Sequence, residues 1–276
     1  MYKKKGDKII LEIIRAVILG VIEGITEWLP ISSTGHMILV NSFMKNKESF
    51  TSNELFIYVI QFGAILAVVS VFFKKLNPFS PSKTIEEKKY TWEMWFRVIV
   101  GCLPAAIIGL LLDPIMEKFE SPFLIAIMLI IYGVLFIITE SINKTPKTDD
   151  MKKMTYKTAF LIGIFQVLSI IPGTSRSGAT ILGAIILGCS RKVAAEFSFF
   201  MAIPVMVGVS SLKILKNLSL LSQENILILL VGMAVAYIVS MISIKMLMSF
   251  VRKHNFKCFG WYRIILGLIV IIYFII

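Results

Sequence analysis

Two short polar segments interrupt long apolar runs, and both carry side chains that do chemistry. The first is Glu23-Gly-Ile-Thr-Glu-Trp-Leu-Pro-Ile-Ser-Ser-Thr-Gly-His36, and the second is Pro172-Gly-Thr-Ser-Arg-Ser-Gly-Ala-Thr180. Each has a proline followed closely by a cluster of hydroxyl side chains. Carboxylates, a histidine and an arginine are costly at membrane depth, so they mark a candidate functional site.

The carboxylates of the first segment have helical spacing. Glu23 and Glu27 are four residues apart, which places both on one face of a helix. In apolar surroundings they repel each other unless one is protonated or a cation lies between them. Oxygen ligands favour Mg²⁺ or Ca²⁺ over zinc, so the pair is a candidate site for a divalent cation. The simpler alternatives are a solvated helix end or an ion pair with Arg176.

The hydroxyl turn of the first segment precedes a short apolar helix. Ser32, Ser33 and Thr34 are followed by Gly35 and His36. Serines at such a position can cap the helix, and the free N–H groups of a helix start can also bind an anion. A histidine within about one turn of a hydroxyl can act as its base or acid. Ser33 is therefore a candidate nucleophile with His36 as its partner, and Ser32 and Thr34 are candidate substrate ligands.

The second segment has the composition of an anion site. Arg176 lies between Ser175 and Ser177, and Thr180 follows one turn later. The guanidinium is a planar fork that suits a phosphate or a carboxylate, and the hydroxyls add donors. The alternative is an arginine that extends to a membrane interface. Because it stands between a proline–glycine pair and a further glycine, we interpret Arg176 as an anion ligand, supported by the three hydroxyls.

The composition is that of an integral membrane protein. Of the 276 residues 57% are hydrophobic and 17% are charged, and the mean hydropathy is +0.83. Several apolar runs are long enough to cross about 30 Å of hydrocarbon, and they are continuous rather than alternating, which favours helices over a barrel. The net charge of +12 is explained by basic loops at an anionic membrane surface, so we expect no nucleic-acid partner.

We therefore predict an all-α polytopic membrane protein with about six spanning helices and two re-entrant helix hairpins. A proline breaks each hairpin, because it lacks a donor and clashes with the preceding turn. Non-helical backbone at this depth must be buried in protein or line a cavity. The expected hairpins are 9–29 with 37–44 and 158–171 with 178–188, and the expected spans are 55–73, 95–112, 123–139, 197–215, 226–248 and 264–276.

The two halves of the chain resemble each other. An offset of 142 residues aligns Pro30 with Pro172 and Ser33 with Ser175. We divide the chain into a first repeat, 1–145, and a second repeat, 146–276, each with one hairpin and three spans. Three crossings are an odd number, so the second repeat is expected to be inverted. The hairpin tips then enter from opposite faces and meet near the midplane.

Basic residues predict the orientation. One side receives the segments 74–89, 144–157, 191–192 and 252–257. The other side receives the N-terminus and a smaller set of lysines, namely Lys45, Lys47, Lys118 and Lys216. By the positive-inside rule the first side is cytoplasmic, and both termini face outward.

The two segments resemble the signature motifs of the bacterial undecaprenyl-diphosphatase family of the bacitracin-resistance type. The resemblance extends over nearly the whole chain and includes the Gln61-Phe-Gly-Ala and Phe197-Ser-Phe neighbourhoods. Trp28 stands where the family pattern leads us to expect phenylalanine, which is a mild departure.

The resemblance implies an enzyme of the bacterial cell membrane. It would hydrolyse undecaprenyl diphosphate to undecaprenyl phosphate and phosphate, recycle the lipid carrier for peptidoglycan synthesis and lower bacitracin sensitivity. It also implies a requirement for a divalent cation and an active site open to the outer face. The family's functional residues carry over onto Glu23, Glu27, Ser33, His36 and Arg176. A homodimer is compatible with this interpretation.

Two mechanisms and one competing function stay open at this point. Ser33, deprotonated by His36 or by a glutamate, could attack the terminal phosphorus, or a metal-activated water could attack while Ser33 orients the substrate. Inverted repeats with broken helices are also typical of transporters, so a lipid-phosphate or anion transporter or flippase is the alternative function. The Glu23–Glu27 pair beside Ser33 and His36 favours the hydrolase, because a carrier has little need of such a set.

Overall fold

The computed structural model describes residues 2–44, 49–116, 119, 121–142 and 145–275. In this part of the chain the secondary structure is helical, apart from one isolated bridge between Thr148 and Cys189. The α-helices are α1 (Tyr2–Thr26), α2 (Ser33–Phe43), α3 (Glu54–Val71), α4 (Phe73–Leu76), α5 (Ile85–Met116), α6 (Pro122–Ser141), α7 (Tyr156–Val167), α8 (Arg176–Ile186), α9 (Arg191–Lys216), α10 (Gln223–Phe250) and α11 (Lys257–Ile275). Lys45, Lys47, Lys118, Lys144 and Ile276, used in the predictions of orientation and spans, lie outside the described residues.

The predicted all-α polytopic membrane fold is confirmed. Six of the described helices are long and apolar enough to cross a membrane, namely α3, α5, α6, α9, α10 and α11. They correspond one to one with the six predicted spans. The shorter apolar helices α7 and α8 form the second predicted hairpin, and α1 and α2 form the first.

The main difference from the prediction is the start of α5. The span is predicted to begin at residue 95, but the helix begins at Ile85. Thr84 and Glu87 form a capping box: the Thr84 amide donates to Glu87 Oε2 at 2.8 Å, and the Glu87 amide donates to Thr84 Oγ1 at 3.2 Å. The first turns of α5, which carry both charged and apolar residues, thus form one continuous helix with its apolar span.

The two helix hairpins break in the same way. Ser32 and Ser175 are the non-glycine residues with positive φ in the described chain, both at 71°. Each caps the helix that follows, because its Oγ accepts a hydrogen bond from Gly35 or Gly178 respectively. The two caps are 143 residues apart, one more than the offset that aligns the prolines. Such backbone strain costs of order 1–3 kcal/mol per residue, so the surroundings must hold both serines in place.

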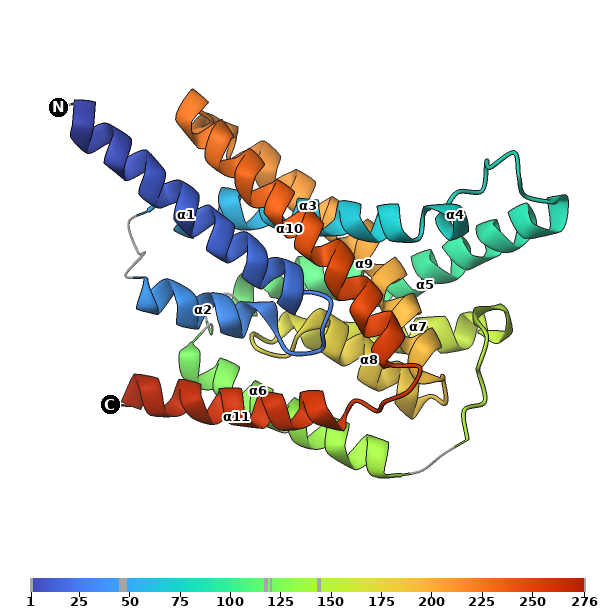
Figure 1. Ribbon diagram of the computed structural model, residues 1–276. Coiled ribbons are helices and arrows are strands. Elements are labelled where there is room, and N and C mark those ends of the chain that lie inside the picture. The colour runs from blue at the N-terminus through green and yellow to red at the C-terminus, as the bar shows by residue number, and fades with distance from the viewer. Residues whose placement is uncertain (1, 45–48, 117–118, 120, 143–144, 276) are drawn as a thin grey trace.

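The hairpins place two helix starts at the centre of the molecule (Figure 1). From there α2 runs towards the end of the molecule that carries both termini, where Phe43 contacts Tyr273 near the end of α11. Helix α8 runs the opposite way, and Gly188, two residues beyond its end, accepts hydrogen bonds at its carbonyl from the amides of Lys147 and Thr148. Around them, α1 packs on α10, α10 on α3, α5 on α7 and α6 on α11.

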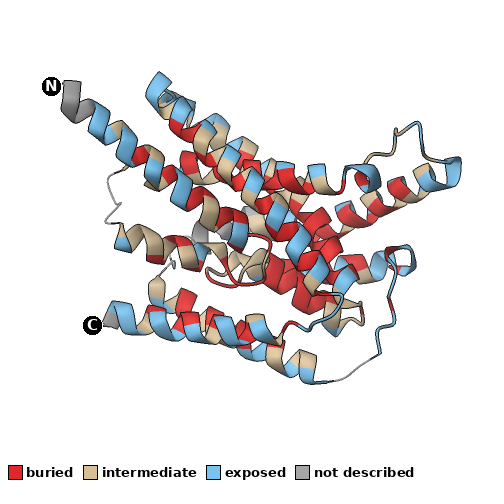
Figure 2. Cartoon of the chain, viewed as in Figure 1, coloured by how far each residue is buried: buried red, intermediate tan, exposed pale blue. Residues whose placement is uncertain are grey.

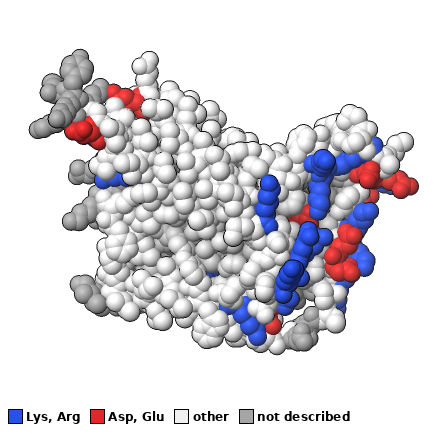
Figure 3. All heavy atoms as spheres, in the orientation of Figure 1, with Lys and Arg blue, Asp and Glu red and all other residues white. Residues whose placement is uncertain are grey.

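Burial is greatest around the breaks and decreases towards the outer faces (Figure 2). The largest apolar cluster includes Trp28, Phe197, Phe199 and Phe200, all essentially inaccessible. The outward faces of the spanning helices instead expose large apolar side chains, as expected for contact with lipid. Figure 3 shows lysine and arginine side chains gathered at one end of the visible face, opposite the end that carries the termini.

Small residues let the helices approach closely, as is common in membrane bundles. A Cβ atom at Gly163 of α7 would lie 2.1 Å from the carbonyl oxygen of Gly101 on α5. A Cβ atom at Gly260 of α11 would lie 2.7 Å from the carbonyl oxygen of Gly133 on α6. These glycine pairs let α7, which leads into the second break, lie close to α5, and they let α11 lie close to α6.

We expect Gly163→Ala to destabilise the protein, because the new methyl group must push α7 away from α5. Overpacking of this kind costs about 1–3 kcal/mol, which lowers the midpoint of thermal unfolding in detergent. Gly208→Ala in α9 is the matched control, since no atom lies within 4 Å of a Cβ there. Equal midpoints for the two variants would contradict the close α5–α7 contact.

Candidate active site

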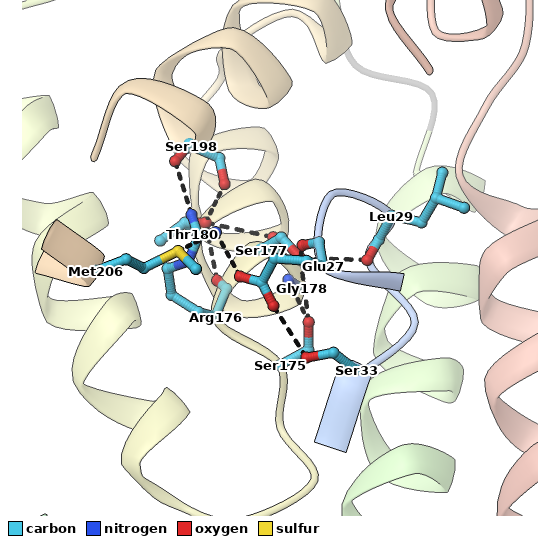
Figure 4. Close-up of polar contacts among 10 residues, drawn as sticks. All are labelled: Glu27, Leu29, Ser33, Ser175, Arg176, Ser177, Gly178, Thr180, Ser198 and Met206. Atoms are coloured by element: carbon cyan, nitrogen blue, oxygen red, sulfur yellow. Dashed lines mark hydrogen bonds and ion pairs between the residues drawn. The ribbon is translucent and has the colours of Figure 1, made fainter. Parts of the chain in front are cut away.

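The two breaks contact each other directly, although about 145 residues separate them. Ser177 on α8 donates its hydroxyl to two main-chain carbonyls of the first break, that of Glu27 at 3.1 Å and that of Leu29 at 3.2 Å. Ser177 is itself buried. Figure 4 shows this contact beside the polar cluster that the two breaks enclose. The contact brings the two sequence motifs into one site.

Glu27 is the centre of that cluster. Its Oε1 accepts a hydrogen bond from Arg176 Nη2 at 2.8 Å, and its Oε2 accepts one from Ser33 Oγ at 2.9 Å (Figure 4). The carboxylate is largely buried, with 9% of the residue exposed. One carboxylate therefore connects the predicted nucleophile to the predicted anion ligand. A carboxylate that accepts the Ser33 hydroxyl proton is placed to act as its base.

Arg176 points into the protein rather than towards a membrane surface. Its Nη1 donates to the main-chain carbonyl of Ser198 at 2.9 Å, and its guanidinium lies 5.7 Å from the centre of the Trp28 ring. Trp28 in turn packs edge-to-face on Phe199. The buried Nε of Arg176 has no partner among the described residues, so one donor of the fork is available to a ligand.

Glu23 contributes a second carboxylate at the end of α1. It is 1% exposed, and its Oε1 has no hydrogen-bond partner in the described part of the chain. The described residues contain no cluster of three or more histidine, cysteine or acidic side chains that could hold a metal ion. An unpartnered carboxylate oxygen next to Glu27 fits a hard cation such as Mg²⁺, which takes few protein ligands and completes its shell with water and substrate phosphates. It does not fit a structural zinc site.

His36 has other partners than the predicted one. Its Nδ1 donates to the Ser32 carbonyl at 2.7 Å, since a carbonyl can only accept, and its Nε2 lies 2.6 Å from the Tyr262 hydroxyl. The two rings are also stacked, at 6°. With Nδ1 protonated, Nε2 accepts from Tyr262. The observed acceptor for Ser33 is Glu27 and not His36, which favours the glutamate among the bases left open by the sequence.

Three hydroxyls of the second motif, those of Ser175, Ser177 and Thr180, are engaged within the protein. Ser175 Oγ accepts from the Gly178 amide and lies 3.2 Å from Ser177 Oγ. Thr180 Oγ1 donates to the Arg176 carbonyl and lies 2.6 Å from Ser198 Oγ. These bonds hold the first turn of α8 in shape. A substrate would have to replace some of them in order to use Ser177 or Thr180 as ligands.

The hydroxyls of the first motif differ in exposure. Ser32 is buried and caps α2 through its Oγ, while its carbonyl accepts from His36. Thr34 is exposed on the first turn of α2. Thr34 is therefore accessible to a ligand at the edge of the cluster, whereas the Ser32 side chain is committed to the helix start.

Two residues near the cluster have roles that the sequence did not indicate. Tyr262 binds His36, and the adjacent Arg263 is fully buried and donates to the Pro30, Gly173 and Thr174 carbonyls. Arg263 directly precedes the predicted last span. The buried side-chain amide of Gln166 has no partner in the described chain.

Two cavities, of about 690 and 800 Å³, lie away from the polar cluster. The first is lined by Lys75, Lys83 and Glu196 and the second by Glu140 and Arg191, among others. These lining residues belong to the basic end of the molecule. The catalytic chemistry is assigned from the polar contacts at the breaks, because neither cavity is lined by Glu27, Ser33 or Arg176.

The chain is similar to a well-populated group of bacterial proteins. The family described as bacitracin resistance protein BacA matches residues 16–269. An undecaprenyl-diphosphatase of Desulfitobacterium hafniense is 56% identical over 96% of this chain and 97% of its own length. Undecaprenyl-diphosphatases of Latilactobacillus sakei and Enterococcus faecalis are each 57% identical over 95% of this chain and 97% of their own lengths.

We expect Ser177→Ala to destabilise the contact between the two breaks. It leaves the carbonyls of Glu27 and Leu29 without this donor in a buried setting, at a cost of about 1–3 kcal/mol. The measurement is the midpoint of thermal unfolding in detergent. Ser141→Ala is the control, because that hydroxyl bonds only the Ile137 carbonyl of its own helix and is exposed. A Ser177→Ala midpoint as high as that of the control would show that the hydroxyl does not join the breaks.

Proposed function

The chain belongs to the bacitracin resistance protein BacA family, and from this premise we propose that it is an undecaprenyl-diphosphatase. The enzyme hydrolyses undecaprenyl diphosphate to undecaprenyl phosphate and inorganic phosphate. This returns the lipid carrier to peptidoglycan synthesis and lowers sensitivity to bacitracin, which binds the diphosphate form. The observation that carries the proposal is the Glu27 carboxylate, which joins Ser33 to Arg176 where the two breaks meet.

The diphosphate binds between two helix starts in this proposal. Helices α2 and α8 begin at the centre and run in opposite directions, so their positive dipole ends face the same space. Arg176 exchanges its bond to Glu27 for a phosphate oxygen, and its unpartnered Nε is a further donor. Thr34 is exposed beside the start of α2 and can add a hydrogen bond, and Ser175 can add one in exchange for its contact with Ser177 Oγ. Ser32, Ser177 and Thr180 shape the backbone around them.

Ser33 and Glu27 carry the reaction. Glu27 accepts the Ser33 hydroxyl proton while Ser33 Oγ attacks the terminal phosphorus, and the bond from phosphorus to the bridging oxygen breaks. Undecaprenyl phosphate leaves, with Arg176 stabilising the developing charge. A water then attacks the phosphoserine and gives its proton to a protein base, while the bond from phosphorus to Ser33 Oγ breaks. Glu27 returns its proton to Ser33 Oγ, and phosphate departs.

Glu23 and Glu27 are the residues that would hold a divalent cation, Mg²⁺ or Ca²⁺. When bound, such an ion neutralises charge on the diphosphate oxygens. The unpartnered oxygen of buried Glu23 supports this proposal. His36, fixed by the Ser32 carbonyl and by Tyr262, is a second group that exchanges a proton at the edge of the site.

We further propose that residues 1–145 and 146–276 are inverted repeats and that the two hairpins are re-entrant. The matched conformations of Ser32 and Ser175 and the opposite directions of α2 and α8 support this arrangement. The basic end in Figure 3 is the cytoplasmic end, so both termini and the opening of the site face the outer side of the cell membrane. A homodimer is the proposed assembly.

A lipid-phosphate transporter is the second candidate, because broken helices that meet at the centre are typical of that class. The Ser33–Glu27 hydrogen bond favours hydrolysis, since a carrier has no requirement for a hydroxyl held on a carboxylate.

The first test is phosphate release from undecaprenyl diphosphate by purified protein in detergent. We expect release with Mg²⁺ or Ca²⁺, loss of release in EDTA, and a decrease of about 100-fold or more in Arg176→Ala, because removing a donor to the transition state costs about that factor. Arg191→Ala is the matched control, since Arg191 pairs with Glu140 at the basic end. Bound lipid without phosphate release under any metal condition would favour the transporter.

The second test separates the two hydrolytic mechanisms. We expect Ser33→Ala to lower kcat by about 1,000-fold or more, because the nucleophile is lost. A radiolabelled terminal phosphate should remain on the protein after acid quench of the wild type and not after quench of Ser33→Ala. Near-normal turnover by Ser33→Ala would exclude the phosphoserine route and leave direct attack by water.

A further inference from the structure

Arg263 of α11 is fully buried and lies outside the set of residues assigned to the reaction. In the described part of the chain its guanidinium donates hydrogen bonds to main-chain carbonyls, and its Cζ lies 5.3 Å from the centre of the Tyr132 ring. The acceptors belong to both breaks and to α6, namely Pro30 (3.1 Å), Gly173 (3.1 Å), Thr174 (3.0 Å), Leu129 (3.4 Å) and Met128 (3.5 Å).

This arginine has no acidic partner. Among the described residues no carboxylate oxygen lies within 4.0 Å of its guanidinium. Burying a charge without a counter-charge is costly, and well-packed apolar residues often replace buried ionic groups without loss of stability. Packing alone therefore does not require arginine here. What arginine supplies is a set of directed donors that can reach several carbonyls at once.

The hydrogen bonds of Arg263 constrain the two strained serines. The Thr174 carbonyl shares a rigid peptide plane with the Ser175 amide, so holding the carbonyl fixes the plane from which Ser175 adopts its φ of 71°. The Pro30 carbonyl lies two residues before Ser32, which has the same φ. One planar guanidinium thus fixes the chain immediately before α2 and before α8.

The residues that follow the two serines are Ser33 and Arg176, the two groups that bond to Glu27. Arg263 bonds to neither of them. We propose that Arg263 is a positioning residue for the hydrolysis: through main-chain carbonyls of both breaks it sets the separation of Ser33 from Arg176. This inference rests on the proposed function. It assigns to α11 a catalytic effect without contact to the substrate.

The test compares Arg263→Met with Arg263→Lys. We expect Arg263→Met to lower kcat by about 100-fold, since a small displacement of reacting groups can cost that factor, while KM changes by less than about threefold. Lysine keeps the charge but cannot reach the carbonyls of both breaks together, so Arg263→Lys should recover less than about a tenth of the lost activity. Full recovery by lysine would show that charge and not position matters, and would overturn the proposal.

A distance measured between α2 and α8 tests the proposal independently of the rate of phosphate release. Spin labels at Phe43 and Ile186, exposed residues of α2 and α8, report how the two short helices are oriented, in a Cys258→Ser background. We expect a narrow distribution of label-to-label distances in the protein with Arg263 and a broad distribution in Arg263→Met. Arg97→Met is the control, because buried Arg97 pairs with Glu93 and lies over Tyr156, away from both breaks. An unchanged distribution in Arg263→Met would contradict the inference.

The outcomes separate this inference from the function on which it rests. If the wild type releases no phosphate, the proposed function fails. If the wild type and Arg263→Met release phosphate at equal rates per folded protein, the function stands and the positioning role fails. If kcat decreases only in proportion to the folded fraction, judged from the unfolding midpoint of each variant, Arg263 supports the fold alone and the inference is overturned.

Discussion

Backbone that leaves a helix within a membrane protein must find hydrogen-bond partners inside the protein, because lipid offers none. Two helix ends, after Thr26 and after Ile170, form the two breaks, and each break exposes carbonyls that no helical amide can reach. Ser177 and Arg263 satisfy several of them by bridging from one break to the other or to both. Because the free carbonyls of each break need hydrogen-bond donors from the protein, the two breaks pack against each other. The polar cluster forms where they meet.

The same need for hydrogen-bond partners inside the protein explains why Glu27 lies at the centre of the cluster. A buried carboxylate is tolerated when it is fully hydrogen-bonded, and Glu27 accepts hydrogen bonds from the Arg176 guanidinium and the Ser33 hydroxyl. The arginine and the glutamate also form an ion pair, so each satisfies the other. In the proposed function a diphosphate competes with the glutamate for the arginine, so the reaction begins with the exchange of one ion-pair partner.

Much of this arrangement was predictable from the sequence, and the limits have physical causes. Long apolar runs identify spans because only helices satisfy an isolated backbone in lipid, so all six were found. The start of α5 was placed too late because charge was taken to indicate a loop, although Thr84 and Glu87 have capping-box spacing. The Ser33–Glu27 bond and the roles of Tyr262 and Arg263 depend on how distant segments pack, and no local pattern encodes that. Proximity in sequence favoured His36 as the partner of Ser33, but the turn at Ser32 directs the imidazole elsewhere.

The matched serine caps have a consequence for how the two breaks differ. The residue after the left-handed serine is Ser33 at one break and Arg176 at the other, so the same backbone conformation presents a hydroxyl in one place and a guanidinium in the other. The difference between the two positions therefore lies in the side chain and not in the backbone.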